Sequence, residues 1–459
     1  MRFFSSPVVR WDRGFLRKLL MVCLPIVVQN LMAASLHIID GVMIGQLGDA
    51  PYAAVTQATR YVFVFQLFLF GAGSGCGIFF SQHWGTKDVK SMRRVMGLCF
   101  RIGLALAALF GGSALLWPET VIGIFLPRGA SFGYALQYLA IVAPGFFITA
   151  IDNVYATCMK SSGQTVVPMV AGICSILTNT FLNWVLIYGN LGAPALGVQG
   201  AAIATVVSAG VSLAINMICS YTKKLPSAFQ WSDWKMPDKD YLKRFGKTVL
   251  PVVANEGLWS MGTSMYSVFY GRLGDAAVAA VGIVNTVDQL IFTMIYGLMN
   301  ASAILVGNHL GANDKEGARL TADRMIFACI AVGLIMGVVQ MCVKGALVGT
   351  FNVSDEAKGL AVICLTIGSF TIWIRAINSI NVVGILRAGG DTVFSMLLDT
   401  MALWVVGVPL VGIAALVLHW PVYLCYVCTV VEEVIKMLVG LPRYRSGKWM
   451  NDLNHGVEA

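Results

Sequence analysis

The stretch GQLGDA at residues 45–50 returns 226 residues later as GRLGDA at residues 271–276. The match extends on both sides, because residues 24–88 align with residues 250–314 without a gap and 17 of the 65 positions are identical. A register kept over so long a stretch indicates that the chain contains two copies of one unit.

The composition places both copies in a lipid bilayer. Of the 459 residues, 57% are hydrophobic and only 12% are charged, whereas soluble domains carry about 25% charged residues. A spanning helix needs about 20 mostly apolar residues. Twelve segments meet this need: residues 17–45, 53–81, 93–116, 132–158, 166–188, 197–221, 247–270, 277–308, 321–344, 359–386, 392–415 and 418–440. We therefore predict an all-α integral membrane protein, with twelve transmembrane helices in two homologous six-helix lobes that form a parallel repeat around a central cavity.

The basic residues predict the orientation of these spans. With both termini in the cytoplasm, the cytoplasmic segments hold 25 of the 32 Lys and Arg residues, including Arg387 and Lys436, and the opposite side holds five. Such an excess is typical of cytoplasmic loops, so the net charge of +9 does not indicate nucleic-acid binding. We predict a multi-pass protein of the cytoplasmic (inner) membrane with both termini inside.

The spans also predict the domain boundaries. The N-terminal lobe is expected at residues 1–221 and the C-terminal lobe at residues 247–440. The basic stretch between them, residues 222–246, is then a cytoplasmic linker, and residues 441–459 form a cytoplasmic tail.

Three motifs resemble those of the multidrug and toxic compound extrusion (MATE) family. They are GQLG with AAV at residues 45–48 and 53–55, their copies at residues 271–274 and 279–281, and LRAGGDT at residues 386–392. The resemblance covers nearly the whole chain, and the family belongs to a wider superfamily that includes flippases of lipid-linked oligosaccharides and polysaccharides. It implies secondary antiport, in which a proton or a sodium ion enters while an organic, usually cationic, compound leaves.

The first span carries Asp40, an ionisable residue at a place where charge is expensive. His37 precedes it by three residues and shares its helical face, and Pro25 is a predicted hinge because it cannot donate a backbone hydrogen bond. An aspartate in a poorly hydrated cavity can carry a proton, and the resemblance implies this role for Asp40. The alternatives are an Asp40 that reaches the outer membrane surface and a His37 that is simply packed.

In the fifth span, Asn179 and Asn183 lie one helical turn apart on one face. Their amides could bridge to Asp40 or contribute oxygen atoms to a cation, and the resemblance supports this pairing. Family members often have an aspartate at the second position, so Asn183 removes a charge and weakens any sodium site in this half. Hydrogen bonding between helices is the alternative role.

The seventh span carries Glu256, five residues after a second predicted hinge at Pro251. The resemblance implies that Glu256 belongs to the cation or substrate site. The acid that NorM-type sodium sites have in the tenth helix is absent here, and Arg375 occupies that stretch. We therefore predict a coupling-ion site formed by Asp40, Glu256, Asn179 and Asn183.

The spans contain further ionisable residues that are candidates for the substrate cavity: Asp152, Asp288, Asp399 and Arg375, together with His37. Buried acids and bases are often paired for structural reasons. We expect Arg375 to neutralise one of the intramembrane acids, with Asp399 or Glu256 as the favoured partner.

No pattern in the sequence is typical of an enzyme, a metal site or a resident cofactor. The five histidines are dispersed, and there is no phosphate-binding loop for ATP. We predict a monomeric antiporter that exports organic cations in exchange for H⁺ or Na⁺, with membrane lipid around it and no nucleic-acid partner. A flippase of the same superfamily is the alternative, although a pyrophosphate substrate requires basic residues and, apart from residues counted with the loops at the span ends, only Arg101 and Arg375 lie in the predicted spans. A channel is disfavoured because the two copies share no polar filter.

Overall fold

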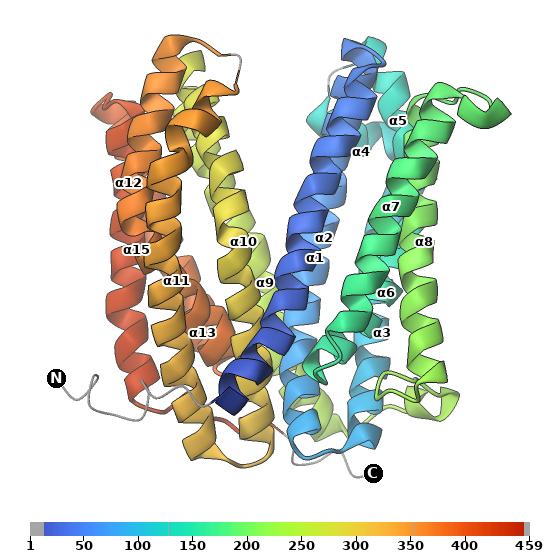
Figure 1. Ribbon diagram of the computed structural model, residues 1–459, viewed down its shortest axis with the longest axis vertical. Helices are drawn as coiled ribbons and strands as arrows, with labels where there is room; N and C mark the ends of the chain where they lie inside the picture. Colours follow the sequence, from blue (N-terminus) through green and yellow to red (C-terminus); the bar gives the residue numbers. More distant parts are fainter. Residues whose placement is uncertain (1–12, 127, 352, 454–459) are drawn as a thin grey trace. The chain divides into compact units, whose positions relative to one another are not determined.

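The computed structural model describes residues 13–126, 128–351 and 353–453, except for the side chains of Ala34, His37 and Ile38. All regular secondary structure in this part of the chain is helical (Figure 1). The first half contains α1 (Arg13–Gly45), α2 (Asp49–Gly85), α3 (Val89–Leu116), α4 (Pro118–Phe125), α5 (Ala130–Val142), α6 (Gly145–Ser161), α7 (Val166–Tyr188), the short 3₁₀ helix η1 (Asn190–Gly192) and α8 (Val198–Thr222). The second half contains the 3₁₀ helix η2 (Trp231–Trp234), α9 (Lys239–Gly271), α10 (Asp275–Gly311), α11 (Lys315–Gly349), α12 (Asp355–Ser379), α13 (Thr392–Met401), α14 (Val408–Gly412), α15 (Val422–Arg445) and the π-helical segments η3 (Ile380–Arg387), η4 (Ala402–Gly407) and η5 (Ile413–Val417).

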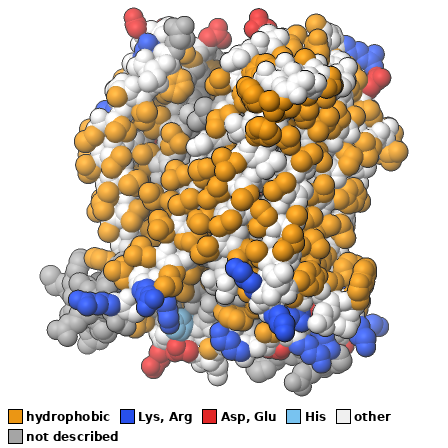
Figure 2. Space-filling model, turned by 45° about the vertical axis from the view of Figure 1, so that its right-hand side comes forward, with side chains coloured by type: hydrophobic (Ala, Val, Ile, Leu, Met, Phe, Trp, Pro, Cys, Tyr) orange, Lys and Arg blue, Asp and Glu red, His pale blue; other side chains and the backbone are white. Residues whose placement is uncertain are grey.

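The helices have the length and surface of membrane spans. Nine of those described are long and apolar enough to cross a bilayer, and the pair α5 and α6, bent by 48°, provides a tenth span. Helices α9 and α15 coincide with the seventh and twelfth predicted spans but contain more polar residues. Hydrophobic side chains cover the middle of the surface in Figure 2, while Lys and Arg side chains gather near one end. The predicted all-helical membrane protein is confirmed.

The chain divides into two compact units. Of the described residues, 24–242 form the N-terminal unit, and 13–23 with 243–453 form the C-terminal unit. Helices α7 and α8 pack along each other within the first, and α11 and α12 within the second (Figure 1). Most of the predicted linker belongs to the N-terminal unit, where Trp234 stacks on Phe100 and accepts a hydrogen bond from Arg101 at its carbonyl.

The duplicated sequence adopts the same backbone in both units. Gly48 and Gly274 precede α2 and α10 with φ angles of 106° and 105°, a left-handed region that glycine enters without steric cost. Further along, Asp88 and Asp314 cap α3 and α11 by accepting hydrogen bonds from backbone N–H groups at 3.0 and 2.8 Å. The internal repeat of the sequence is therefore a repeat of structure.

The residues that follow α15 pack against the loop after η3. Trp449 is fully buried, stacks on Tyr444 and donates from Nε1 to the Tyr444 carbonyl at 2.9 Å. Asn451 donates its backbone and side-chain N–H groups to the Gly389 carbonyl at 3.0 and 3.1 Å. A buried aromatic ring and two hydrogen bonds thus hold the end of the described chain in place.

Replacing Trp449 by Ala is expected to release this segment. Loss of a buried tryptophan costs about 3–5 kcal/mol, which the two Asn451 hydrogen bonds at about 1 kcal/mol each do not offset. Trypsin should therefore cleave purified Trp449→Ala after Lys448 faster than it cleaves the wild type. The control is Trp231→Ala, at a side chain that is 90% exposed, and it should leave cleavage unchanged. Equal cleavage of Trp449→Ala and wild type would contradict the proposed packing.

The cap of α11 predicts a pH-dependent contribution to stability. The Gly317 backbone N–H, and next the His309 side chain, hold the pKa of Asp314 below its ordinary value of 3.8. A carboxylate with a lowered pKa stabilises the fold above its ordinary pKa, and this stability is lost as the pH falls through the lowered value. Asp314→Ala should lose about 1 kcal/mol at neutral pH, measured as a lower melting temperature, and the difference from wild type should vanish in strong acid. Asp314→Asn can still accept the hydrogen bond and should lose less; a deficit of Asp314→Ala that is independent of pH contradicts the cap.

Candidate functional site

In the N-terminal unit, Asp40 of α1 meets two asparagines of α7. The Asn183 side chain donates from Nδ2 to Asp40 Oδ1 at 2.7 Å and to Asn179 Oδ1 at 2.9 Å. Both asparagines are 1% exposed, and Asn183 Oδ1 has no hydrogen-bond partner among the described residues. The structure therefore brings together three of the four residues predicted for the coupling site.

This trio, Asp40 with Asn179 and Asn183, contains a single formal charge. An ionised Asp40 accepts the Asn183 N–H, which stabilises the carboxylate. A protonated Asp40 would instead need an acceptor for its O–H, and a turn of the Asn183 amide would bring its unpartnered oxygen into that role. The geometry can satisfy both protonation states of one aspartate, which is what a proton-binding site requires.

The other candidates of the N-terminal unit lie in different surroundings. Asp152 of α6 accepts hydrogen bonds from Ser212 at 2.8 Å and Asn216 at 2.7 Å, both on α8, so it links these two helices. Pro25 lies within α1, which continues through it as a helix. His37 lies on α1, but its side chain is outside the described part of the structure.

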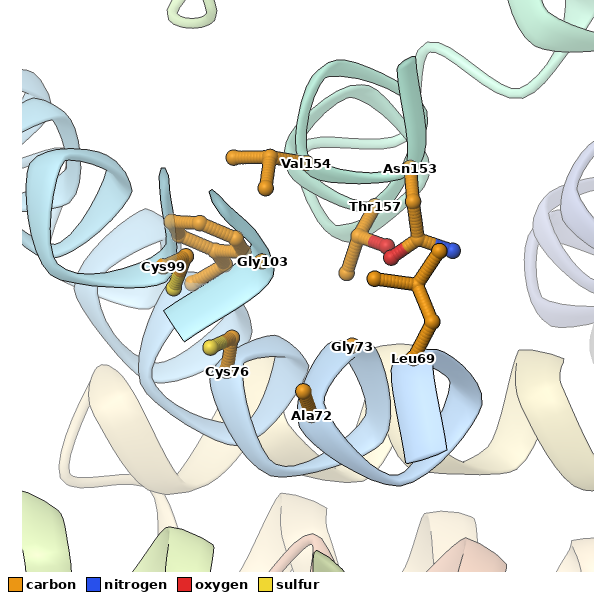
Figure 3. A pocket seen from close by; sticks show the side chains of 10 residues that line it. Leu69, Ala72, Gly73, Cys76, Cys99, Gly103, Asn153, Val154 and Thr157 are labelled. Atoms are coloured by element: carbon orange, nitrogen blue, oxygen red, sulfur yellow. The ribbon is translucent and has the colours of Figure 1, made fainter. Parts of the chain in front are cut away.

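A small pocket lies between α2, α3 and α6 of the same unit (Figure 3). Cys76 and Cys99 line one side of it, and Asn153 with Thr157 face Gly73 on the other. A Cβ atom at Gly73 would stand 2.8 Å from Asn153 Oδ1, so the glycine allows α2 and α6 to approach closely. This pocket does not include the trio.

Glu256 of α9 lies in the C-terminal unit, where it is paired. The Arg387 guanidinium donates from Nη1 to Glu256 Oε1 at 2.7 Å, and its Nη2 lies 4.0 Å from Asp399 Oδ2. Lys436 of α15 lies 2.9 Å from Asp399 Oδ1 and 2.6 Å from Glu432 Oε1. Pro251 lies within α9 one turn before Glu256, and the helix continues through it.

Arg375 does neutralise one of the predicted acids, but that acid is Asp288, so Asp399 and Glu256 were the wrong partners to expect. Its Nη1 lies 2.6 Å from Asp288 Oδ2, and its guanidinium stacks 4.3 Å above the Phe292 ring. Asp399 is already paired with Lys436, and Glu256 with Arg387. Arg375 of α12 therefore pairs with Asp288 of α10.

The sequence analysis missed four members of this network: Arg387, Lys436, Glu432 and Glu433. The first two count there as cytoplasmic loop residues, yet they are 2% and 3% exposed. One signal was present, because Glu432, Glu433 and Lys436 place three charges inside one predicted span. Three charges at a spacing of one helical turn indicate a buried polar face rather than a lipid-facing helix.

The family model described as MatE matches residues 25–185 and 251–413, one region in each unit. The chain belongs to the MatE family. Members of this family are multi-pass membrane transporters, and this chain's relatives include proteins named for multidrug resistance.

Two curated relatives span almost the same length as this MatE chain. "Multidrug resistance protein PmpM" of Pseudomonas aeruginosa is 25% identical over 419 residues, which cover 88% of this chain and 86% of the relative. "Probable multidrug resistance protein NorM" of Thermotoga maritima is 22% identical over 440 residues, covering 94% and 93%.

Solved structures show the same fold. The Vibrio cholerae MATE transporter VcmN in the bent form is similar with a TM-score of 0.85 at 19% identity, covering 97% of this chain and 98% of that one. A MOP superfamily transporter from Pyrococcus furiosus gives a TM-score of 0.86 at 18% identity, covering 96% and 97%. The two-repeat helical architecture is thus that of MATE transporters.

The Arg375–Asp288 pair predicts a thermodynamic coupling. Arg375→Met leaves a mostly buried aspartate without its cation, a change that costs about 3–5 kcal/mol when both partners are fully buried. The 32% exposure of the Arg375 side chain places the expected loss at or below the lower end of that range. Melting of the purified protein in detergent should show that Arg375→Met with Asp288→Asn recovers much of the stability that Arg375→Met alone loses. Strictly additive effects of the two substitutions would contradict a direct pair.

Proposed function

We propose that this protein is a secondary antiporter that exports organic, mostly cationic compounds in exchange for protons. The observation that carries the proposal is the hydrogen-bonded trio of Asp40 with the buried Asn179 and Asn183, on membrane-spanning helices of a MatE-family chain. We further propose that it works as a monomer in the cytoplasmic membrane, with both termini in the cytoplasm.

Competition for one negative charge would couple the two fluxes. An ionised Asp40 attracts a cationic compound, whereas a proton on Asp40 removes that attraction. Two ligands that exclude each other at one group are thermodynamically linked, so the gradient of one can drive the other. Protons are proposed over sodium because Asn179 and Asn183 add neutral amides rather than a second carboxylate, and a metal cation prefers more negative charge.

The flippase alternative depends on unpaired positive charge. The C-terminal unit buries more basic side chains than the sequence predicted, but Arg387 contacts Glu256, Lys436 contacts Asp399 and Glu432, and Arg375 contacts Asp288. Basic groups that carboxylates already neutralise are poor ligands for a pyrophosphate. The paired charges therefore favour drug export.

The test is ethidium efflux from preloaded cells that express the wild type or Asp40→Asn. Efflux should stop when the proton gradient is collapsed, and Asp40→Asn should lower its rate about tenfold or more, within the usual range of coupling energies. Asp49→Asn, which changes an acid at the start of α2, is the matched control and should export normally. Efflux that only a sodium gradient drives would contradict proton coupling, and a wild type that exports no organic cation would contradict drug export.

A further inference from the structure

The C-terminal unit buries more negative charge than positive charge around α15. Four carboxylates surround two cations there: Glu256, Asp399, Glu432 and Glu433 against Arg387 and Lys436. Arg375 also acts electrostatically on Glu433, but its charge is already neutralised by Asp288. Counting this pair therefore leaves the surplus of two negative charges unchanged. Full ionisation would leave two uncompensated charges in a low-dielectric region, which is far more costly than binding protons.

The contacts identify which carboxylates carry the surplus. Asp399 faces Lys436 at 2.9 Å and Arg387 at 4.0 Å and accepts a bond from Asn255 at 3.1 Å. Glu256 has its own partner in Arg387. Both are therefore well stabilised as anions.

Glu432 and Glu433 have fewer contacts that stabilise a negative charge. They share the Lys436 ammonium at 2.6 and 3.7 Å. Among the described residues, the second Glu432 oxygen accepts a hydrogen bond from the Tyr266 hydroxyl alone, at 2.5 Å. Of the four carboxylates, Glu433 lies farthest from its nearest cation, and 23% of its side chain is exposed against 5% for Glu432. A proton can therefore reach the pair through Glu433.

Two buried asparagines have unused polar atoms, one in contact with this pair and one farther along the same face of α15. Asn378 is 5% exposed and donates from Nδ2 to Glu433 Oε2 at 2.7 Å, yet its Oδ1 has no partner among the described residues. Asn381, one turn further along and 1% exposed, leaves both polar atoms of its amide without a described partner. Its Nδ2 would lie 2.7 Å from a Cβ atom at Gly440, one turn beyond Lys436. Buried polar atoms need hydrogen-bond partners, and the described residues supply none for these atoms, so they are available to a proton-bearing group or a water molecule.

We propose that the Glu432–Glu433 pair is a second proton-binding site, which takes up one exchangeable proton in addition to the proton on Asp40. A hydronium ion transfers its proton to a Glu433 carboxylate oxygen, which leaves a neutral acid and a water molecule and reduces the surplus from two negative charges to one. The new O–H can donate to Asn378 Oδ1 once that amide turns. The role of this proton in export depends on the proposed antiport, whereas its binding does not.

The surroundings select a proton over a metal cation. The Lys436 ammonium already lies within 2.9 Å of both Asp399 and Glu432, at the point where a sodium ion would sit. Among the described residues, no group of three or more His, Cys, Asp or Glu side chains is arranged to hold a metal ion. The charged and titratable groups that act on the pair directly are Tyr266 of α9, Arg375 of α12 and Lys436 of α15. Behind them lie Asp399, Arg387 and Glu256, linked through Lys436, and Asp288 and Tyr426, linked through Arg375.

Infrared difference spectra of the purified full-length protein in lipid vesicles, recorded across a pH titration, test the site directly. The C=O stretching band of protonated carboxyls should contain two titrating components in the wild type. Asp40→Asn should remove one, and either Glu432→Gln or Glu433→Gln should remove the other. Glu356→Gln, at an exposed acid in the first turn of α12, is the control and should leave both. Glu433→Gln, the more exposed position, provides the result if Glu432→Gln does not fold.

The outcomes separate this inference from the proposed function. The titration uses no drug, so loss of the second component in Glu433→Gln supports the site even if the wild type exports no ethidium. Wild-type spectra for both glutamine variants would overturn the inference while proton-driven efflux through Asp40 still stood. A second component that sodium ions displace at constant pH would also overturn it, because the site would then bind a metal cation. In reconstituted vesicles, Glu433→Gln should exchange one proton fewer per ethidium than the wild type, and an unchanged ratio would remove the pair from the transport cycle.

Discussion

A charge in the hydrocarbon region of a bilayer must be paired, hydrogen-bonded or neutralised by a proton. The polar contacts described above follow from this constraint. In the N-terminal unit, one aspartate is held by asparagine amides. In the C-terminal unit, ion pairs join α9, η3, α13 and α15 into one network, and a separate pair joins α10 to α12. These contacts fix the helices more specifically than apolar packing does, because each depends on direction and distance.

The duplication shows how two copies of one unit have diverged under the same constraint. The residue that corresponds to Asp40 in the second copy is Tyr266. Asp40 accepts from Asn183 of α7, whereas Tyr266 donates to Glu432 of α15. In both copies this position makes a polar contact with another spanning helix. In the first copy the acid is on the repeated helix itself (Asp40), whereas in the second copy it is on the helix that is contacted (Glu432). A carboxylate is thus retained in each unit while its place in the chain differs.

The fold follows closely from the sequence, whereas the ion pairs do not. The shared register of residues 24–88 and 250–314 predicts the repeat, and Gly48 with Gly274 and Asp88 with Asp314 show it in matching backbone angles and caps. Spacing along one helix also predicts that Asn179 and Asn183 share a face. No such rule reaches from Arg375 to Asp288, because 87 residues separate them and the contact depends on how α10 and α12 are rotated. Arg387 was misjudged for the same reason: a basic residue at the end of a span can face water or turn inward.

By itself, the sequence determined the membrane environment, the helical fold, the twofold repeat and the family. The length of an apolar run and the register of a repeat can be read along the chain, and a bilayer requires spans of that length to form helices. It also singled out Asp40, since one acid in a long apolar run stands out whatever surrounds it. Only the tertiary structure decided which charges are paired, which amide atoms are left unused and where negative charge is in surplus. Those properties depend on distances of a few ångströms between side chains from different helices, and electrostatic energy at low dielectric changes steeply over such distances.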